Sequence, residues 1–561
     1  MPDDFGAAYD AARSQFEAVH NAPPPSDWPF QCLGHDRGKF FLYTVEGRQV
    51  LTFTARDLSS HGALMTIATL RWLEGAFPGR DSFNARGAAD AIMRACYRAG
   101  VFNPDRLRGR GIWIDDSRRV MHLGDRLLVD GMATPLDQHR SAFIYEQARP
   151  LDVSLGEPLS DTEARRILAM CEACSWADPV RDGRLLAGWI VSALIGGALA
   201  WRPHLWMLAE GGSGKSWVME NIIRPLLGPL AVIMQGKTTE AGIRGELGQD
   251  ARPVVFDEAE TQSEHDRARM QQAIDLARQA SSEDGGAIVK GTKEGGSRRY
   301  TIRASFCFAS INAGLTQAAD ESRFATLSLV HGSPDQFEAL KRTHVEAMIP
   351  GVAGRLLARA IAMLPTIRAN ADLLAEAIAR TGAGRRAGDT IGTLIACQMA
   401  LVDTTQLTPE TAAAYIEARQ WLRETASEAK VAPEYERAVA HLMQAEGMRV
   451  TSGGRAEAVT ISELISACYD MVPDNVIGFR DADMALRRLG MRVMDERLLI
   501  GNRASGVAEK FRSTPWGSGW FATLARVPGT QRNVLARFTP AYRDKCIAIP
   551  LSFLVGGQDG G

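Results

Sequence analysis

The segment Ala209–Ser216 reads AEGGSGKS and places glycines, a lysine and a serine at a spacing suited to holding phosphate. Glycines let backbone N–H groups curl around phosphate oxygens, and the positive end of a following helix adds to the attraction. We expect Lys215 to reach the β- and γ-phosphates of ATP and the Ser216 hydroxyl to bind Mg2+. The predicted nucleotide contacts are Gly211, Gly212, Ser213, Gly214, Lys215, Ser216 and Trp217.

The neighbouring residues supply the context that this motif needs. The apolar run 205–208 predicts a strand before the loop, and residues 217–227 predict a helix after it. A phosphate-binding loop lies between such elements, although here Ala209 stands where the first glycine is usual. The alternative is a glycine-rich turn that only opens a helix.

A second motif, Pro253–Glu260, is an apolar strand that ends in two carboxylates. Asp257 is suited to Mg2+ and Glu258 to polarising the attacking water. Such short strings are common, so the prediction depends on its position downstream of the phosphate loop, which leaves room for a helix and a strand.

The third motif is the apolar run Ala304–Asn312, which ends in an amide. The carboxyl end of a buried parallel strand faces the ligand crevice, so Asn312 is placed to orient water or sense the γ-phosphate. Arg323 follows and could act as an arginine finger in a neighbouring subunit's site. The alternatives are an Asn that begins a turn and an Arg that pairs with Asp320.

Together these motifs resemble the AAA+ ATPases, and more narrowly the superfamily 3 helicases of viruses, phages and plasmids, which are often fused to primases. That family carries a basic hairpin before the Asn strand, and here residues 288–300 (IVKGTKEGGSRRY) occupy the place. Residues 238–244 (TTEAGIR) also look like the phage and mobile-element branch. The resemblance covers about residues 185–330. It implies DNA contacts at Lys290, Lys293, Arg298 and Arg299.

The resemblance implies a ring, expected to be a hexamer, that hydrolyses ATP at subunit interfaces and unwinds DNA for a phage or mobile element. Its partners would be single-stranded and forked DNA and a primase or other replication protein, in the bacterial cytoplasm. One alternative is a AAA+ loader or remodelling ATPase that acts on protein, against which the basic hairpin argues. Another is a non-catalytic origin-binding protein, against which Glu258 argues.

The fold class expected is α/β: a parallel-sheet ATPase core at 151–335, an α+β domain at 1–150, a helical lid at 336–432 and a winged-helix-like domain at 433–561. The net charge of −2 means that DNA binding must come from local basic patches. Cys171 and Cys174 form the one close cysteine pair, which we interpret as helix thiols in preference to zinc ligands. The uncharged run 185–201 contains three glycines and leads into the phosphate-loop strand, so we expect a core helix instead of a membrane span.

The N-terminal 150 residues predict a short amphipathic helix over 1–25, a hairpin over 40–44 and 49–54, helices over 57–73 and 87–100, and a β pair over 111–114 and 126–129. The residues Asp115, Asp116 and His122 only weakly resemble the metal ligands of a primase. The basic run Arg106, Arg108 and Arg110 could touch nucleic acid or lie in a solvated turn.

The last two segments carry weaker signals. Either Arg355 or Arg359, which share a helix face, or the pair Arg385 and Arg386 could sense nucleotide from the lid, and solvated helix charges are the alternative. Helices over 435–447, 460–470 and 481–490 and a strand over 497–500 predict a winged helix, which binds either DNA or protein.

Overall fold

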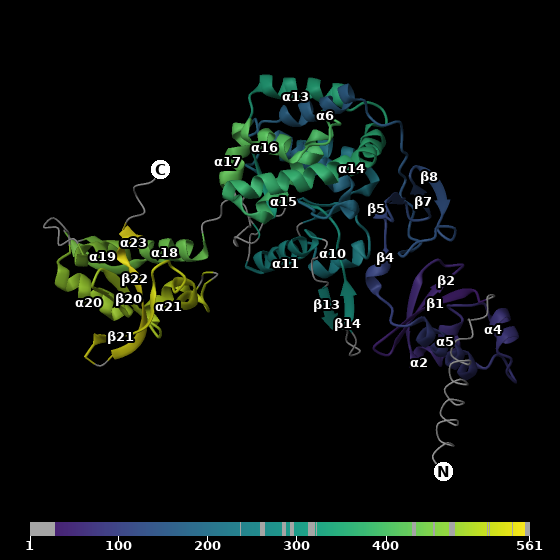
Figure 1. Cartoon of the computed structure of the whole chain (residues 1–561), viewed down its shortest axis with the longest axis horizontal. Coiled ribbons are helices and arrows are strands. Elements are labelled where there is room, and N and C mark those ends of the chain that lie inside the picture. Colours follow the sequence, from purple (N-terminus) through teal and green to yellow (C-terminus); the bar gives the residue numbers. More distant parts are fainter. Residues whose placement is uncertain are drawn as a thin grey trace, which may run out of the picture. The chain divides into compact units, whose positions relative to one another are not determined.

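The computed structural model describes residues 28–235, 237–257, 264–282, 288–291, 297–311, 320, 322–428, 433–452, 455–469, 477–512, 514, 516–540 and 542–555. Of residues 264–265, 288–291, 297–300, 426–428, 451–452, 455–457 and 555 it describes the backbone alone. The chain forms two compact units, Met1–Ala429 and Lys430–Gly561 (Figure 1). The helix expected over 1–25 lies outside the described residues.

A five-stranded parallel sheet forms the centre of the first unit, in the order β11-β12-β15-β10-β16. Its strands are β10 (His204–Ala209), β11 (Val232–Gln235), β12 (Val254–Asp257), β15 (Phe306–Ser310) and β16 (Phe324–Leu329). Their sequences are almost continuously apolar, as a parallel sheet covered by helices on both faces requires. This confirms the predicted α/β class with a parallel sheet.

The register brings the carboxyl ends of three neighbouring strands to one edge of this sheet. Leu208 of β10 lies opposite Ser310 of β15, and Phe256 of β12 lies opposite Phe308 of β15. The strand before the glycine-rich loop and the strand that ends in Asp257 therefore lie on either side of β15. Ligands of open α/β sheets bind in the crevice outside this edge.

An aromatic row stiffens one face of the sheet. Trp206 stacks on Phe308 with ring centroids 5.1 Å apart, and Phe308 stacks on Phe256 at 5.2 Å. The helices α10 (Glu240–Leu247) and α11 (Glu264–Ala280) contribute buried apolar residues to the same cluster. The row therefore joins the three central strands to their helical cover.

The helical segment after β10 changes pitch along its length. It comprises α8 (Lys215–Val218), a π-helical turn (Met219–Ile223) and α9 (Arg224–Leu227). Pro225 has no N–H, so an α-helical bond to the carbonyl of Asn221 is impossible, which accounts for the π turn. His344 takes that place, with its Nε2 3.1 Å from the Asn221 oxygen.

Helices cover the opposite face of the sheet and extend beyond it (Figure 1). They are α6 (Asp161–Glu172), α7 (Asp182–Leu194), α13 (Pro334–Ala347), α14 (Val352–Ile378), α15 (Arg385–Met399), α16 (Pro409–Glu417) and α17 (Gln420–Glu428). All residues of α7 but one are buried, which confirms the core helix predicted from its apolar run. Gly188 of α7 allows close packing, because a Cβ there would lie 2.1 Å from the Leu394 oxygen of α15.

Among the described residues no single helix has the length and hydropathy of a membrane span. The helix pair formed by residues 334–347 and 352–383, bent by 72°, meets the criterion only when its two parts are joined.

The N-terminal part is a three-stranded antiparallel sheet beside helices. It contains β1 (Phe30–Asp36), β2 (Lys39–Thr44), β3 (Val50–Thr54), α2 (Ala55–Leu58), α3 (His61–Leu64), α4 (Leu70–Ala76) and α5 (Ala85–Ala99). The predicted hairpin is confirmed as β2 and β3. The helical region predicted over 57–73 is present as three short helices, because the Ser60 and Thr69 hydroxyls cap new helices by accepting backbone N–H groups.

A second small sheet follows, and it differs from the predicted β pair. Its meander contains β5 (Gly111–Asp115), β6 (Arg118–His122), β7 (Arg126–Val129) and β8 (Met132–Pro135), and β4 (Leu107–Arg108) pairs with β9 (Ile144–Tyr145) nearby. The strand β6 separates the two predicted partners. Asp116 and Ser117, both with positive φ, form the tight turn that makes β5 and β6 a hairpin.

Two arginines of the basic run before this sheet, Arg108 and Arg110, make structural contacts and do not lie in a solvated turn, whereas contact of the run with nucleic acid stays a prediction. The Arg108 guanidinium lies over the rings of Trp113 and Phe143, at 4.7 and 4.1 Å from their centroids. Arg110 forms a buried ion pair with Asp250 at 2.6 Å, at the base of β12. These contacts fasten the small sheet to the parallel-sheet core.

The second unit has its own hydrophobic core. Its elements are α18 (Glu434–Gln444), β17 (Glu446–Ser452), β18 (Arg455–Thr460), α19 (Ile461–Tyr469), α20 (Phe479–Leu489), β19 (Met491–Met494), β20 (Arg497–Gly501), α21 (Ser505–Phe511), α22 (Trp520–Leu524), β21 (Gln531–Thr539), β22 (Tyr542–Pro550) and α23 (Leu551–Val555). The expected helices and strand are present. The hairpin of β21 and β22, absent from the sequence-based prediction, extends the sheet in the order β19-β20-β22-β21.

A buried imidazole joins the amino edge of the parallel sheet to α11. His204 Nδ1 accepts a hydrogen bond from the Phe306 N–H at 3.1 Å, so the ring is neutral and Nε2 carries the proton. Nε2 lies 2.6 Å from the Ala277 oxygen and 2.9 Å from the Ser281 hydroxyl. Burial lowers the pKa of His204 to about 3.

This neutral histidine predicts a specific loss of stability in acid. Below the ordinary histidine pKa of about 6.5, His204 binds a proton in the unfolded chain but stays neutral in the folded chain. The free energy of unfolding therefore falls as the pH drops from about 6.5 toward 3. The contribution is about 1.4 kcal/mol per pH unit, or about 2 kcal/mol at pH 5. We expect urea unfolding of His204→Gln to change less between pH 7.5 and 5 than that of wild type. The exposed His61→Gln serves as control, and identical pH dependence in all three proteins would contradict the assignment.

Candidate nucleotide-binding site

The glycine-rich loop leaves the carboxyl end of β10 and turns into α8 with backbone angles that only glycine adopts easily. Gly212 has φ +85° and Gly214 has φ +97°. The Ser213 hydroxyl donates a hydrogen bond to the Glu210 oxygen at 2.8 Å, and the Ser213 N–H donates to the same oxygen at 3.1 Å. These bonds hold the loop in a tight turn.

The helix that follows presents its first N–H groups to the loop. Gly214 is the residue before the helix and provides no side chain to cap them. Uncapped N–H groups and the positive helix end attract anions. Lys215 is half-buried in the first turn and Ser216 is exposed, so a cation and a hydroxyl stand where the sequence places the triphosphate.

Asp257 lies at the end of β12, at the same sheet edge, and is about a quarter exposed. Arg224 Nη2 lies 3.6 Å from its carboxylate, and Arg224 also pairs with Glu220 one turn earlier on the same helical segment. Carboxylate and hydroxyl oxygens are ligands that Mg2+ accepts, so Asp257 and Ser216 fit as a donor set.

Sequence reasoning missed Arg224. The detectable signal is its four-residue spacing from Glu220, which places both on one face of the helix after the loop.

Two predicted catalytic residues, Glu258 and Asn312, lie outside the described residues. Glu258 follows Asp257 directly, and Asn312 follows the end of β15. Their roles stay predictions. Trp217 packs edge-on against Phe337 and His344 of α13, with centroids 5.8 and 5.3 Å away, and its contact with nucleotide also stays a prediction.

Arg323 lies at the opposite edge of the sheet, because it immediately precedes β16, whose first residue pairs with His204 at the start of β10. Its pKa is lowered by partial burial and by the nearby cations Arg386 and Arg278. Asp320 is fully buried, with Arg278 at 3.5 Å. Several arginines therefore gather at an edge that faces away from the chain's own phosphate loop.

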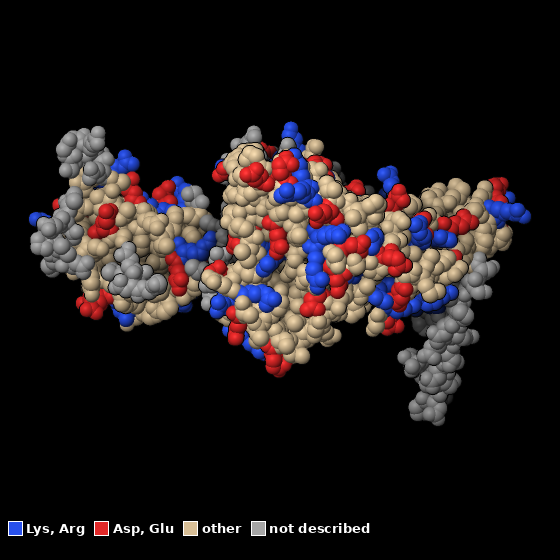
Figure 2. Space-filling view, turned by 90° about the horizontal axis from the view of Figure 1, so that it is seen from above, with Lys and Arg blue, Asp and Glu red and all other residues tan. Residues whose placement is uncertain are grey.

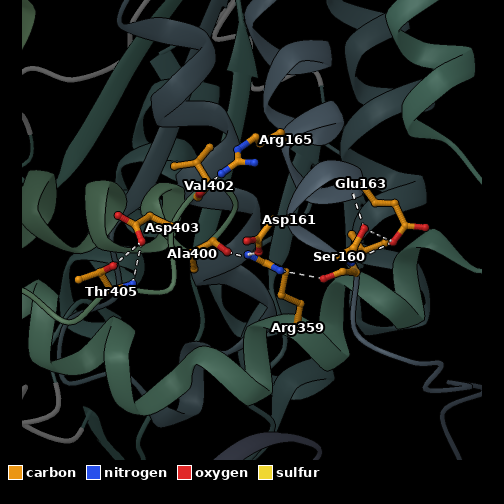
Figure 3. A network of polar contacts seen from close by, with 10 residues as sticks. Ser160, Asp161, Glu163, Arg165, Arg359, Ala400, Val402, Asp403 and Thr405 are labelled. Atoms are coloured by element: carbon orange, nitrogen blue, oxygen red, sulfur yellow. Dashed lines mark hydrogen bonds and ion pairs between the residues drawn. The ribbon is translucent and has the colours of Figure 1, made fainter.

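Two of the predicted nucleotide sensors in the lid, Arg355 and Arg359, form ion pairs and hydrogen bonds within the helical layer. Arg355 makes two hydrogen bonds to the Glu163 carboxylate, at 2.8 and 2.7 Å, and holds the pKa of Glu163 down at about 2. Arg359 donates to the oxygens of Ala400 and Leu159 and to Asp161 (Figure 3). Both guanidiniums therefore bind α6 or the segment just before it, and nucleotide sensing by Arg355 or Arg359 stays a prediction.

The other two candidates differ from each other. Arg385 pairs with Asp389 on its own helix at 2.8 Å. Arg386 acts electrostatically on Arg323. Of the four lid arginines, Arg386 is therefore the one that the structure connects to the edge carrying Arg323.

The weak metal pattern in the small sheet does not form a site. Asp115 is buried and contacts His139 at 2.9 Å and the Tyr145 hydroxyl at 3.2 Å, whereas Asp116 is exposed in the turn. His122 pairs with Gly111 at the far end of the hairpin, and burial lowers its pKa to about 4. Within the described ranges no three His, Cys, Asp or Glu side chains gather as metal ligands.

Burial raises the pKa of Cys171 well above its usual value and that of Cys174 to about 12. Both thiols are buried in the core that includes α6 and α7.

No model of a known protein family and no curated protein matches the sequence. Among solved structures, the chain is similar to SCCmec type IV Cch, described as an active helicase, with 13% identity, TM-score 0.45, and coverage of 94% of this chain and 95% of that one. It is similar to the apo C-terminal region of NrS-1 with 9% identity, TM-score 0.30, and coverage of 93% and 96%. It is also similar to the full-length MCM homolog from Methanopyrus kandleri, with 15% identity, TM-score 0.26, and coverage of 56% of this chain and 74% of that one. TM-scores of this size do not establish a shared fold.

The loop geometry predicts that glycine is needed at position 214. Alanine there would be forced into the left-handed region, which costs roughly 1–2 kcal/mol, so Gly214→Ala should weaken ATP binding about 5- to 30-fold. Titration of a fluorescent ATP analogue with Mg2+ present measures this. Gly245→Ala is the control, because Gly245 lies exposed on α10 with open space around its Cβ position. Equal affinity of Gly214→Ala and wild type would contradict the assigned loop.

Proposed function

We propose that this protein is an ATP-hydrolysing helicase that moves along DNA. The observation that carries the ATPase part is the shared sheet edge: the glycine loop and Lys215 after β10 lie on one side of β15, and Asp257 lies on the other. A triphosphate on the loop would have a cation, a hydroxyl and a carboxylate within its reach. The pattern has no evident use in a purely structural domain.

Each residue of the edge has a definable task in hydrolysis. Backbone N–H groups of 211–216 would bind the phosphate oxygens, and Lys215 would neutralise the β- and γ-phosphates. Ser216 and Asp257 would hold Mg2+, whose chemistry is to neutralise charge on the transferring phosphoryl group. Glu258 would accept a proton from the attacking water, and Asn312 would orient that water.

The DNA part rests on a hairpin apart from the main sheet. Among the described strands, β13 (Ile288–Gly291) and β14 (Ser297–Tyr300) form a two-stranded sheet of their own, which projects from the core below α11 (Figure 1). The register sets Lys290 opposite Arg298, two like charges whose cross-strand pairing is unfavourable without a counterion. Lys293 lies outside the described residues, in the segment that joins the strands. A DNA backbone would supply negative charge to this pair.

Local basic features must supply DNA binding, because the chain has no overall positive charge. On the face in Figure 2, the described Lys and Arg side chains are interspersed with Asp and Glu. With a net charge of −2, the whole chain would not attract DNA as a polycation.

We further propose that subunits assemble in a ring, expected to be a hexamer, in which Arg323 completes a neighbour's site. Support comes from topology: Arg323 lies at the amino edge of the sheet and the phosphate loop at the carboxyl edge, so one chain cannot readily bring both together. Replication of a phage or mobile element in the bacterial cytoplasm, with a primase as partner, remains part of the proposal on the strength of the motif resemblance.

The central test joins hydrolysis to unwinding. Wild type should hydrolyse ATP faster with single-stranded DNA and separate forked DNA. Lys215→Ala should lose ATP binding, and Glu258→Gln should bind ATP but hydrolyse it very slowly, since the water loses its base. Filter binding, phosphate release and strand displacement measure the three steps. Hydrolysis by Glu258→Gln at the wild-type rate would refute the assignment, and ATPase without DNA stimulation would favour a protein-remodelling enzyme.

The next prediction concerns DNA binding by the β13–β14 hairpin. Lys290→Ala with Lys293→Ala should leave basal ATPase intact. The dependence of single-strand affinity on salt should become shallower by about 0.7 in log–log slope for each DNA phosphate that the variant no longer neutralises. Lys341→Ala with Arg342→Ala on α13 removes the same charge elsewhere and serves as control. An unchanged slope together with normal unwinding would show that the hairpin is not the grip.

Subunit mixing tests whether the site is shared. Arg323→Ala and Lys215→Ala proteins should each be nearly inactive, because fingers of this kind contribute roughly 10³–10⁵ in rate. Mixed, they should regain ATPase, since a Lys215→Ala subunit can offer its Arg323 to an Arg323→Ala neighbour whose loop is intact. The rate is measured against mixing ratio with subunit exchange confirmed. A flat, inactive curve would count against a finger in trans.

A further inference from the structure

The C-terminal unit carries a cationic surface that the proposed ATPase cycle does not use. Strands β21 and β22 form its outer hairpin, and β21 is the edge of the four-stranded sheet. Four cationic residues lie on these strands, and their exposed side chains contrast with the single carboxylate, Asp544, which is buried. The cationic residues are Arg532, Arg537, Arg543 and Lys545.

The buried carboxylate does not balance these charges, because it is already engaged. Asp544 accepts hydrogen bonds from the Tyr542 hydroxyl at 2.9 Å and from the Arg503 N–H at 2.8 Å, and a third from the N–H of the next residue. Arg503 contributes one more exposed guanidinium, 3.4 Å from the same carboxylate. The hairpin surface thus keeps an excess of positive charge.

The strand register places two of these cations face to face. Arg537 lies opposite Arg543, and the next cross-strand pair on that side is Leu535 with Lys545. Like charges directly opposite one another destabilise a hairpin, and the exposed Leu535 adds apolar surface beside them. Such a row gains stability when an extended anion binds along it.

A hollow of about 360 Å3 opens beside this row, between the hairpin and α22. Three cations line it: Arg526, Arg532 and Lys545, together with the ring of Phe521 and the amides of Asn502 and Asn533. No Asp or Glu is among the lining residues. Of the three cations, Arg526 has a carboxylate partner among the described residues, because Glu434 lies 3.5 Å from it.

The hollow owes its lining to an irregularity in β21. The pairing with β22 shifts between Gln531 and Val534, and Asn533 adopts φ +59°, which Asn tolerates better than most residues. The Arg532 guanidinium is held by a 2.9 Å hydrogen bond to the Ala525 oxygen. The bulge therefore fixes a cation and an amide at the mouth of the hollow.

We propose that this surface, the hollow with the Arg537 and Arg543 row, binds single-stranded nucleic acid as a second contact independent of the β13–β14 hairpin. Cations along the strands would neutralise successive phosphates, and an aromatic ring and amides in the hollow suit a base. A small anion could bind in the hollow without contacting the row. A row of cations beside the hollow fits a polymer that carries several phosphates. The inference rests on the proposed DNA helicase function and adds a binding site to it.

The test removes two cations that make no ion pair in the described structure. Arg543→Gln with Lys545→Gln is introduced into the full chain that already carries Lys290→Ala and Lys293→Ala, so that hairpin binding is reduced. We expect weaker binding of a fluorescent oligothymidine, with a salt slope shallower by about 1.4, because two fewer phosphates of the single strand are neutralised. Arg449→Gln with Arg512→Gln removes equal charge from the same unit, from two exposed residues, and should change neither quantity.

Competitors decide what kind of polymer binds. Duplex DNA should compete less well than a single strand, and polyglutamate should not compete. Equal competition by duplex would overturn the single-strand assignment, and effective polyglutamate would assign the surface to an acidic protein partner. An affinity and salt slope equal to those of the control variant would overturn the site altogether.

Two further measurements separate this inference from its premise. Photocrosslinking of iodouracil-substituted DNA should label Phe521 in the wild-type chain, and it decides the question if the β22 variant fails to fold. Absence of labelling at Phe521 alongside labelling elsewhere would count against the hollow. Failure of the proposed function would look different: wild type would then show no DNA stimulation of ATPase and no strand displacement.

Discussion

Pairing five parallel strands in a sheet that is buried on both faces is the constraint on which the rest of this molecule depends. Such a sheet needs helical crossovers, and these force the strands to begin at one edge and end at the other. The aromatic row through Trp206, Phe308 and Phe256 fixes the strands side by side. The positions of the glycine loop and Asp257 follow from that arrangement alone.

The two edges of the sheet have opposite chemistry for the same reason. The carboxyl edge collects N–H groups, the helix end and Lys215, all of which attract phosphate. The amino edge holds the neutral His204 and, just before β16, Arg323 among other arginines. In the ring proposed above, a second copy in the same orientation would bring the amino edge of one subunit's sheet toward the carboxyl edge of the next subunit's sheet.

The strand, loop and helix around the phosphate motif could be predicted from sequence, because continuous apolar runs and glycine spacing express local requirements. The strand β6 was missed, since Arg118 and Arg119 at its start resemble a solvated turn. The helical region over 57–73 was predicted without its division into three helices, because hydrophobic periodicity does not reveal the caps at Ser60 and Thr69. The β21 and β22 hairpin was also missed, because its charged residues conceal the alternation of a half-buried strand.

Arginine roles were the hardest to predict, and the physical reason is the geometry of guanidinium. Its five donors can bind backbone carbonyls far away in sequence, as Arg359 does with Leu159 and Ala400. Helix spacing alone cannot distinguish such an anchor from a ligand-binding side chain. Exposure and counterions do distinguish the two kinds of arginine. Arg359 is buried beside Asp161, whereas Arg537 is exposed opposite Arg543. In a chain whose net charge is close to zero, it is arginines facing other cations, not arginines as a class, that mark where a polyanion is needed.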